Sequence, residues 1–247
     1  MSSLAQRMFK RYYPEYTDVF HHLLEQKLNN CERVLDAGCG DGRIFTYDFK
    51  EKVNMLVGLD LRQDLAKNEQ IHSAAQGSVE QAPFVDGTFD LVFSRFVLEH
   101  VQEPADAFIE FARVLRPGGI LVVAVPNAFH YFVIAGRIIP HSLQQRIASW
   151  VGYKEADTFP TYYRANTCKR LNALAKRAGL ELKKVVRWEP CPWFVSFSAI
   201  TLAPAILYER LVNRYESLAP LRAHIIATCE KVGSPQELDR VEDVIKN

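Results

Sequence analysis

The stretch VLDAGCGDGR, residues 34–43, combines an acid with a glycine-rich loop at the end of an apolar run. Its glycines are spaced as in a loop that follows a strand, opens a helix and brings its backbone close to a ligand; they are Gly38, Gly40 and Gly42. A dinucleotide-binding loop has a glycine where this chain has Arg43. Asp36 would repel a pyrophosphate, so the loop is predicted to face a cationic group.

The elements that position this loop alternate between strands and helices. Buried parallel strands are predicted at four apolar runs, and helical patterns separate most of them; the runs are residues 33–38, 55–60, 91–96 and 120–125. This alternation indicates an α/β fold, with a mostly parallel sheet and helices on both faces. Ligands of such sheets bind at the carboxyl ends of the strands, where the glycine loop lies.

The later part of the chain is less regular. A helix is predicted over 166–179, with Asn166 or Thr167 as its N-cap and Gly179 at its end. Two further strands are predicted at 181–188 and 223–232. The aromatic-rich segments 128–165 and 190–220 are too long for plain connections, so we expect insertions over the strand ends. The tail 234–247 is predicted to be an amphipathic helix or frayed.

Composition limits the classes of function. A chain of 247 residues, 48% hydrophobic and 24% charged, predicts one soluble globular domain with a sizeable core. Its net charge of +1 gives no overall field for nucleic acid. The five scattered cysteines form no C-x-x-C pair, and the N-terminus has no apolar signal core, so a cytoplasmic location is expected; they are Cys31, Cys39, Cys168, Cys191 and Cys229.

Five motifs occur in order between residues 30 and 127: VLDAGCGDGR, the acid of VGLDL, GSVEQAPFVDGTFDLVFS, LEHV and VLRPGGILVVAVPN. Together they resemble the class I S-adenosylmethionine (SAM)-dependent methyltransferases, in particular the small-molecule branch of the ubiquinone-biosynthesis (type 11) enzymes. The resemblance implies a Rossmann-like sheet of seven strands with a reversed last strand, in a single domain over 1–247. Its expected parts are a helical segment 1–30, a SAM-binding core 31–127, lid insertions 128–165 and 190–220, and a last helix and strands in 166–189 and 221–232.

The resemblance places SAM across the ends of the first, second and fourth strands. Asp36 would attract the ammonium and the sulfonium of SAM, and Asp60 would accept hydrogen bonds from both ribose hydroxyls. The alternative is that both acids only cap helices or turns. The full predicted cofactor set is Asp36, Gly38, Cys39, Gly40, Asp60, Leu61, Ser78, Val79 and Ser94.

The adenine position departs from the family pattern. Similar proteins carry an acid where this chain has Ser78, whose hydroxyl is a weaker acceptor for the adenine amino group. The backbone of Val79 is expected to share this contact. Glu80 is either the replacement acid or a solvated loop residue.

His100 is the predicted general base, because the resemblance places it next to the transferred methyl and its pKa class suits proton abstraction. The alternative is a histidine that begins the next helix, and His130 is the reserve candidate. Related O-methyltransferases have E-x-x-E-H, but the first position is Phe96 here, which leaves Glu99 and His100 without a third ligand. No required metal is predicted, and Phe96 is expected to line the acceptor pocket.

The acceptor site is predicted from the two insertions. Residues 128–170 carry a local charge of +4, which either favours an anionic substrate or marks a solvated face. Arg164 either binds the acceptor or pairs with Asp157 or Glu155. Residues 193–211 are too broken by polar residues to span a bilayer, and are expected to cover an apolar substrate or touch a membrane surface. The predicted substrate residues are Tyr16, Phe96, Tyr131, Tyr162, Tyr163 and Arg164.

The predicted activity is methyl transfer from SAM to a small, largely apolar or aromatic acceptor, on oxygen. A non-catalytic SAM-binding regulator, and a methyltransferase acting on carbon, nitrogen or a lipid-like acceptor, are the alternatives. Asp36 and Arg43 disfavour a nucleotide-dependent oxidoreductase. No basic aromatic stripe supports nucleic acid, and the oligomeric state is left open.

Overall fold

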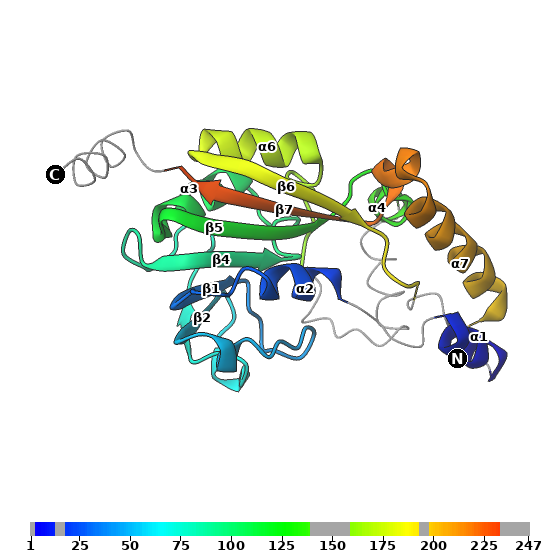
Figure 1. Ribbon diagram of the computed structural model, residues 1–247, viewed down its shortest axis with the longest axis horizontal. Coiled ribbons are helices and arrows are strands. Elements are labelled where there is room, and N and C mark those ends of the chain that lie inside the picture. Colours follow the sequence, from blue (N-terminus) through cyan, green and yellow to red (C-terminus); the bar gives the residue numbers. More distant parts are fainter. Residues whose placement is uncertain (1–2, 13–17, 139–158, 193–197, 233–247) are drawn as a thin grey trace.

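The computed structural model describes residues 3–12, 18–138, 159–192 and 198–232. Seven strands form one sheet in the order β3-β2-β1-β4-β5-β7-β6 (Figure 1). The strands are β1 Arg33–Ala37, β2 Met55–Asp60, β3 Ser73–Gln76, β4 Phe89–Arg95, β5 Leu115–Pro126, β6 Leu180–Trp188 and β7 His224–Lys231. The first five are parallel, and β7 runs antiparallel between β5 and β6. This is the Rossmann-like methyltransferase fold with its reversed last strand, as expected.

Strand β1 occupies the point where the strand order changes direction. It pairs with β2 on one side and with β4 on the other. The chain therefore continues from β1 towards β2 and β3 in one direction, and from β4 towards β5 in the opposite direction. A crevice forms at such a switch point, outside the carboxyl ends of the strands. The sheet topology therefore brings the ends of β1, β2 and β4 together.

Helices cover both faces of the sheet. Helix α2 (Val19–Glu25) packs Phe20 and Leu24 onto one face. Helices α3 (Pro104–Val114) and α6 (Cys168–Arg177) pack onto the other, where Phe108, Phe111 and Leu171 are buried. Burying one apolar stripe of each helix against a sheet that is apolar on both faces closes the core.

Helix α6 begins and ends as its sequence predicts. Thr167 is the N-cap, and its side chain accepts a hydrogen bond from the Arg170 amide. Gly179 follows the helix with φ +74°, a conformation in which glycine has no Cβ penalty. The capping residue and the terminating glycine were both readable without tertiary information.

The connection between β1 and β2 differs from the expectation that the glycine loop opens a helix. Residues 38–54 contain only the short 3₁₀ turn η1 (Lys50–Lys52). The prediction was wrong: three glycines of this loop have positive φ, and no helix follows them before η1. Similarly, η2 (Leu65–Lys67) lies between β2 and β3, and the short edge strand β3, of sequence SAAQ, was not predicted because it lacks the usual strand residues.

Several helical elements lie beyond the edge at which β5 ends (Figure 1). They are α1 (Ser3–Tyr12), α4 (Tyr131–Ile138), α7 (Ala199–Arg214) and the 3₁₀ segment η5 (Glu216–Leu221). They include parts of the predicted insertions 128–165 and 190–220, whose role as lids stays a prediction. The division of the chain into a helical segment, a SAM-binding core and a last helix with strands also stays a prediction. The tail 234–247 lies outside the described residues. Within the described ranges, no helix is both long and apolar enough to cross a membrane.

Asn127 joins the end of β5 to the start of β7. Its buried amide donates to the carbonyl oxygens of Pro220 and Arg222, at 2.7 Å each. We expect Asn127→Ala to lower the free energy of unfolding by about 2–4 kcal/mol, since two buried carbonyls lose their donor. The exposed Asn213, whose amide donates to the Glu189 carbonyl at 3.0 Å, is the matched control. Denaturant unfolding measures both, and equal losses for the two alanine variants would contradict this role of Asn127.

Candidate functional site

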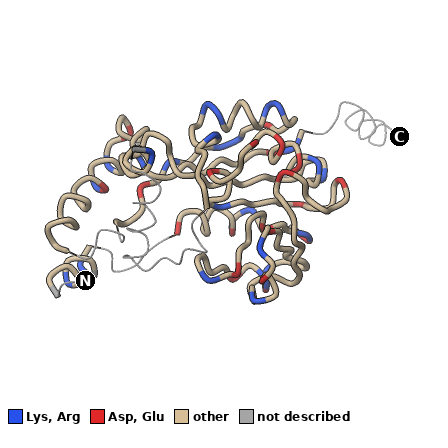
Figure 2. The backbone as a smooth tube through the Cα atoms, turned by 180° about the vertical axis from the view of Figure 1, so that it is seen from behind, with Lys and Arg blue, Asp and Glu red and all other residues tan. Residues whose placement is uncertain are grey.

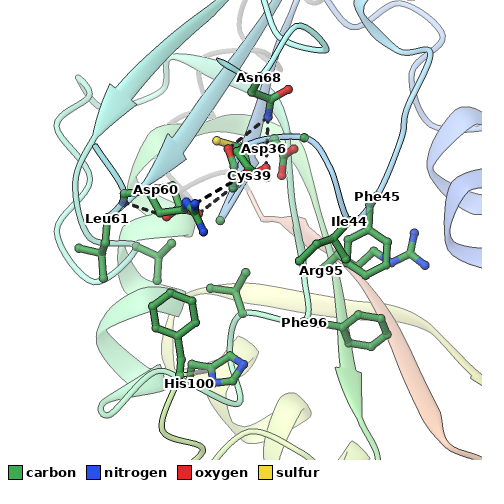
Figure 3. Close-up of a pocket in the computed structure, with 18 of the residues that line it drawn as sticks. Asp36, Cys39, Ile44, Phe45, Asp60, Leu61, Asn68, Arg95, Phe96 and His100 are labelled. Carbon is green, nitrogen blue, oxygen red and sulfur yellow. Dashed lines mark hydrogen bonds and ion pairs between the residues drawn. The ribbon is translucent and has the colours of Figure 1, made fainter. Parts of the chain in front are cut away.

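A cavity of about 270 Å³ opens at the carboxyl ends of β1, β2 and β4 (Figure 3). Ten of the residues predicted for the site line it: Asp36, Gly38, Cys39, Gly40, Asp60, Leu61, Ser78, Val79, Phe96 and His100. They come from the ends of three strands and from the loops that follow. The sheet topology is therefore what brings these residues, distant in sequence, around one space.

Two carboxylates enter this cavity from adjacent strands. Asp36 is 6% exposed, and burial, followed by the nearby negative charge of Asp60, raises its pKa to about 8, while Arg95 acts in the opposite direction. Asp60 is held in place because its carboxylate accepts hydrogen bonds from the Gly40 amide at 2.9 Å and the Arg62 amide at 3.0 Å. A cation in the cavity would relieve the repulsion between the two acids.

The glycine loop approaches the β4 side of the cavity closely. A Cβ on Gly38, which has φ +91°, would lie 2.1 Å from Cγ2 of Val97. The amides of Gly38 and Cys39 both donate to the Leu59 carbonyl, at 2.7 and 3.2 Å. Only glycine fits at Gly38, both for its backbone conformation and for the available space.

Two side chains that also line the cavity hold the loop, and neither was predicted. Asn68, which is buried, donates to the carbonyl oxygens of Cys39 at 3.2 Å and Gly40 at 3.4 Å. The Gln70 amide nitrogen donates to the carbonyls of Gly42 and Phe45, the latter at 3.1 Å, while its oxygen accepts from the Tyr47 amide. A loop without a following helix leaves these backbone groups without helical partners, and the two amides replace them.

Arg95, at the end of β4, was also missed. It lies in the cavity wall (Figure 3), donates to Asp18 Oδ2 at 2.6 Å, and stacks its guanidinium 3.9 Å from the centre of the Phe45 ring. Asp18 is at the same time the N-cap of α2. A single arginine in the otherwise apolar run LVFSRF was the available sequence signal, since a buried charge requires a partner.

His100 and aromatic rings line the part of the cavity opposite the glycine loop. His100 Nδ1 lies 2.9 Å from the Pro160 carbonyl oxygen, which can only accept, so Nδ1 carries a proton. Burial lowers the pKa of His100, although the carbonyls of Pro160 and Phe159 act in the opposite direction. The neutral ring then has its lone pair on Nε2. The Phe159 ring lies 5.8 Å from the His100 ring.

Phe96 occupies a strained backbone position at the same place. Its φ of +56° is rare for a bulky residue and follows directly after β4. Its ring lies 5.7 Å from the Phe45 ring and 4.6 Å from the His224 ring. The surrounding rings hold this conformation, which keeps the Phe96 side chain in the cavity wall.

The sequence and the fold are similar to those of known methyltransferases. Residues 35–123 match the family model described as a methyltransferase domain. The chain is 36% identical over 95 residues to a malonyl-[acyl-carrier protein] O-methyltransferase of Serratia marcescens, covering 37% of each chain. It is 30% identical over 115 residues to a ubiquinone biosynthesis O-methyltransferase of Parvibaculum lavamentivorans, covering 42% of this chain and 45% of that one.

A solved putative methyltransferase from Bacillus halodurans has the same fold, with a TM-score of 0.54 and 19% identity, covering 87% of this chain and 99% of that one. Over this matched region the chain is similar to SAM-dependent methyltransferases. S-adenosylmethionine is the methyl donor of the family. The matched region spans little more than a third of the Serratia relative, so the activity of the whole protein is treated below as a proposal.

The end of the cavity at which adenine is expected is polar. Ser78 Oγ accepts from the Glu80 amide at 3.1 Å and lies 3.4 Å from Glu80 Oε2. Both residues and Val79 line the cavity. A serine and a glutamate therefore stand together where similar methyltransferases carry one acid.

Other predicted residues do not line this cavity. Ser94 is buried, and its hydroxyl donates to the Ala37 carbonyl at 2.8 Å. His130 is buried 3.4 Å from the buried Glu189 carboxylate, and Tyr131 packs its ring against Tyr208. Tyr16 lies outside the described residues. The roles assigned to these side chains stay predictions.

The segment around Arg164 is fixed to the connection between β4 and α3. The amides of Tyr162 and Tyr163 donate to the Glu99 carbonyl, at 2.7 and 3.2 Å. Arg164 donates to Glu103 Oε1 and to the Gln102 carbonyl, at 2.6 Å each. Its predicted partners Asp157 and Glu155 lie outside the described residues. The acceptor-binding role of these three side chains stays a prediction, while Phe159 of the same segment reaches the cavity.

The neighbouring Glu99 and His100 face different surroundings. Glu99 is buried outside the cavity lining, its Oε2 has no hydrogen-bond partner, and burial raises its pKa to about 8. In the part of the chain that the structure describes, no three His, Cys, Asp or Glu side chains are grouped to hold a metal ion. The expectation of no required metal stays a prediction.

Asn68 should act on cofactor affinity through the glycine loop. We expect Asn68→Ala to raise the Kd for SAM about tenfold, because two hydrogen bonds of roughly 1 kcal/mol each restrain the loop carbonyls. Turnover at saturating SAM should change little, since Asn68 positions the loop and not the reacting atoms. Calorimetry at a temperature where the variant is folded measures the affinity, with Asn213→Ala as the control. An unchanged Kd would contradict this role.

Proposed function

We propose that this protein transfers the methyl group of SAM to a small, largely apolar or aromatic acceptor, on an oxygen atom. The observation that carries this proposal is one cavity with two carboxylates at one side and a neutral histidine among aromatic rings at the other. The first side suits a cationic ligand, and the second suits an apolar acceptor with one proton to lose.

The carboxylates support a specific placement of SAM. Asp36, buried and raised in pKa, is the proposed partner of the methionyl ammonium and lies near the sulfonium, because positive charge offsets its cost of ionisation. Two backbone amides hold the Asp60 carboxylate in place, and this carboxylate is the proposed acceptor of hydrogen bonds from the ribose hydroxyls. Ser78 and Glu80 would receive the adenine amino group, with the backbone of Val79 beside them.

Methyl transfer requires little chemistry from the protein beyond alignment. The acceptor oxygen attacks the methyl carbon in line as the carbon–sulfur bond breaks, and the acceptor proton must leave. His100 supplies Nε2 as the proposed base, because its Nδ1 is occupied by the Pro160 carbonyl. Phe96 and Phe159 would exclude water from the sulfonium and contact an apolar acceptor.

One experiment separates this proposal from its alternatives. The protein is incubated with methyl-labelled SAM and a host metabolite extract, and labelled products are identified by mass spectrometry. An O-methylated small molecule supports the proposal, while a product methylated on carbon or nitrogen would correct the atom. SAM binding without any labelled product would favour a non-catalytic SAM-binding regulator.

The raised pKa of Asp36 predicts that protons are released when SAM binds. Because its pKa is about 8 in the free protein, it is mostly protonated at pH 7 and must release nearly one proton when cationic SAM binds. Calorimetry in buffers of different ionisation enthalpy counts that proton, and Asp36→Asn should lose it. The amino group of SAM titrates in the same pH range. The measured quantity is therefore the ratio of the SAM affinity of the wild type to that of Asp36→Asn, which should rise from pH 7 and become constant above pH 8. Equal proton release in both proteins would contradict the placement.

His100 gives a prediction in rate. Removing a positioned base typically lowers the rate about 10²–10⁴-fold, so His100→Ala should reduce kcat while leaving the Kd for SAM nearly unchanged. Since burial lowers the pKa of His100, wild-type activity should fall only as the pH drops below its usual value of about 6.5. The exposed His22, on α2, is the matched control as His22→Ala. Full activity of His100→Ala across pH would make this histidine structural.

A further inference from the structure

Helix α7 carries apolar side chains on the face that it turns to solvent. Ile200 is 86% exposed, Leu207 60% and Leu211 43%. Their spacing of seven and four residues places them on one side of the helix, together with the exposed Pro204. We name these four residues the α7 stripe.

The other side of α7 already has its partner. Leu202 and Ile206 are buried against Ala5 of α1, and Val212 is buried further along the helix. A helix on a protein surface normally pairs one apolar face with a polar one. Apolar residues on both sides of α7 therefore indicate that the α7 stripe is itself a contact surface.

Basic side chains border this stripe. Arg214 follows Leu211 by three residues, so it lies on the stripe's side of the helix, and it is exposed. Arg210 is also exposed and lies at the border towards α1, where its guanidinium stacks on the Tyr12 ring at 4.3 Å. Glu209 falls on the opposite side of the helical turn. Helices α1, α4 and α7 together carry six Lys or Arg residues and one acid, although the whole chain has a net charge of only +1. Figure 2 shows Lys and Arg on these helices.

We propose that the α7 stripe binds the surface of an anionic lipid bilayer. Leucine and isoleucine would enter the boundary between head groups and acyl chains, while the arginines at the border contact lipid phosphates. A second copy of the chain fits less well, because a two-fold contact through the stripe would bring the arginines of both copies into one interface, while the acid of α7, Glu209, lies on the other side of the helix. The proposal is independent of the proposed function, since it uses none of the cavity residues.

The position of α7 gives this contact an orientation. Together with α1 and α4 it lies beyond the edge at which β5 ends, the same edge of the sheet at which the cavity opens (Figure 1). Rings of α4 and α7 are in contact, with Tyr131 and Tyr208 5.1 Å apart. Docking through α7 turns the carboxyl edge of the sheet, and with it the cavity, towards the membrane side.

Vesicle co-sedimentation of the full chain tests the proposal. Vesicles of phosphatidylcholine with phosphatidylglycerol should bind the protein, vesicles of phosphatidylcholine alone should bind it much less, and salt should weaken the first interaction. The double variant Leu207→Gln/Leu211→Gln should lower the partition coefficient about tenfold or more, and Arg214→Gln by less. Val85→Gln is the matched control, because Val85 is 78% exposed in the connection before β4.

Three results would overturn the proposal. The first is equal binding, or none, to both kinds of vesicle. The second is a double variant that binds as wild type does. The third is a wild-type dimer in light scattering that the double variant converts to a monomer, which would make a second copy the occupant. Far-UV circular dichroism and thermal unfolding of each variant show whether it is folded. If the double variant is not folded, the single variant Arg214→Gln, which retains both leucines, still tests the proposal.

Discussion

The repulsion between Asp36 and Asp60 is the constraint on which the arrangement of this site depends. Both acids stand at the ends of neighbouring parallel strands, and β1 is buried on both sides, so a charge on Asp36 is poorly solvated. Two backbone amides hold the Asp60 carboxylate, whereas burial and the charge of Asp60 raise the pKa of Asp36. A site with this imbalance favours a ligand that brings positive charge and disfavours a phosphate.

Another part of the cavity wall comes from the connection between β1 and β2, which contributes Phe45 and Tyr47. Tyr47 and Phe49 stack in parallel at 5.1 Å, and Phe49 stacks on His21 of α2 at 4.6 Å. The ion pair of Arg95 with Asp18 joins the same helix to β4. Because no helix follows the glycine loop, α2 and these rings fill the space over that face of the sheet and fix the cavity wall.

Behind Phe96, the cavity wall continues into a buried polar side chain, His224. The His224 ring packs on Phe96, and burial together with the charges of Arg95 and His130 lowers the pKa of His224 to about 3. It is therefore an uncharged ring that supports Phe96 from behind. Beyond it, His130 and Glu189 face each other at the ends of β5 and β6, which places both histidines behind the cavity wall and not in it.

The sequence by itself determined most of the sheet and ten of the residues that line the cavity. Strands such as 55–60 are apolar runs bounded by polar residues, and helix α6 is defined by its own cap and terminating glycine, so local physics is sufficient for both. Asp36, Asp60 and His100 could be assigned to one site because each follows a strand of a parallel sheet, and carboxyl ends meet at one edge. Their binding and catalytic roles stay predictions.

Only the tertiary structure decided which partners these residues have. Arg95 pairs with Asp18 across 77 residues of sequence, and Asn68 holds loop carbonyls 28 and 29 residues away. The missing helix after Gly42 and the edge strand β3 likewise depend on packing, since SAAQ has no strand preference of its own and is paired only because β2 presents a free edge. Such contacts join residues that are far apart in the sequence. The periodic patterns that indicate helices and strands extend over only a few residues, so they could not predict these contacts.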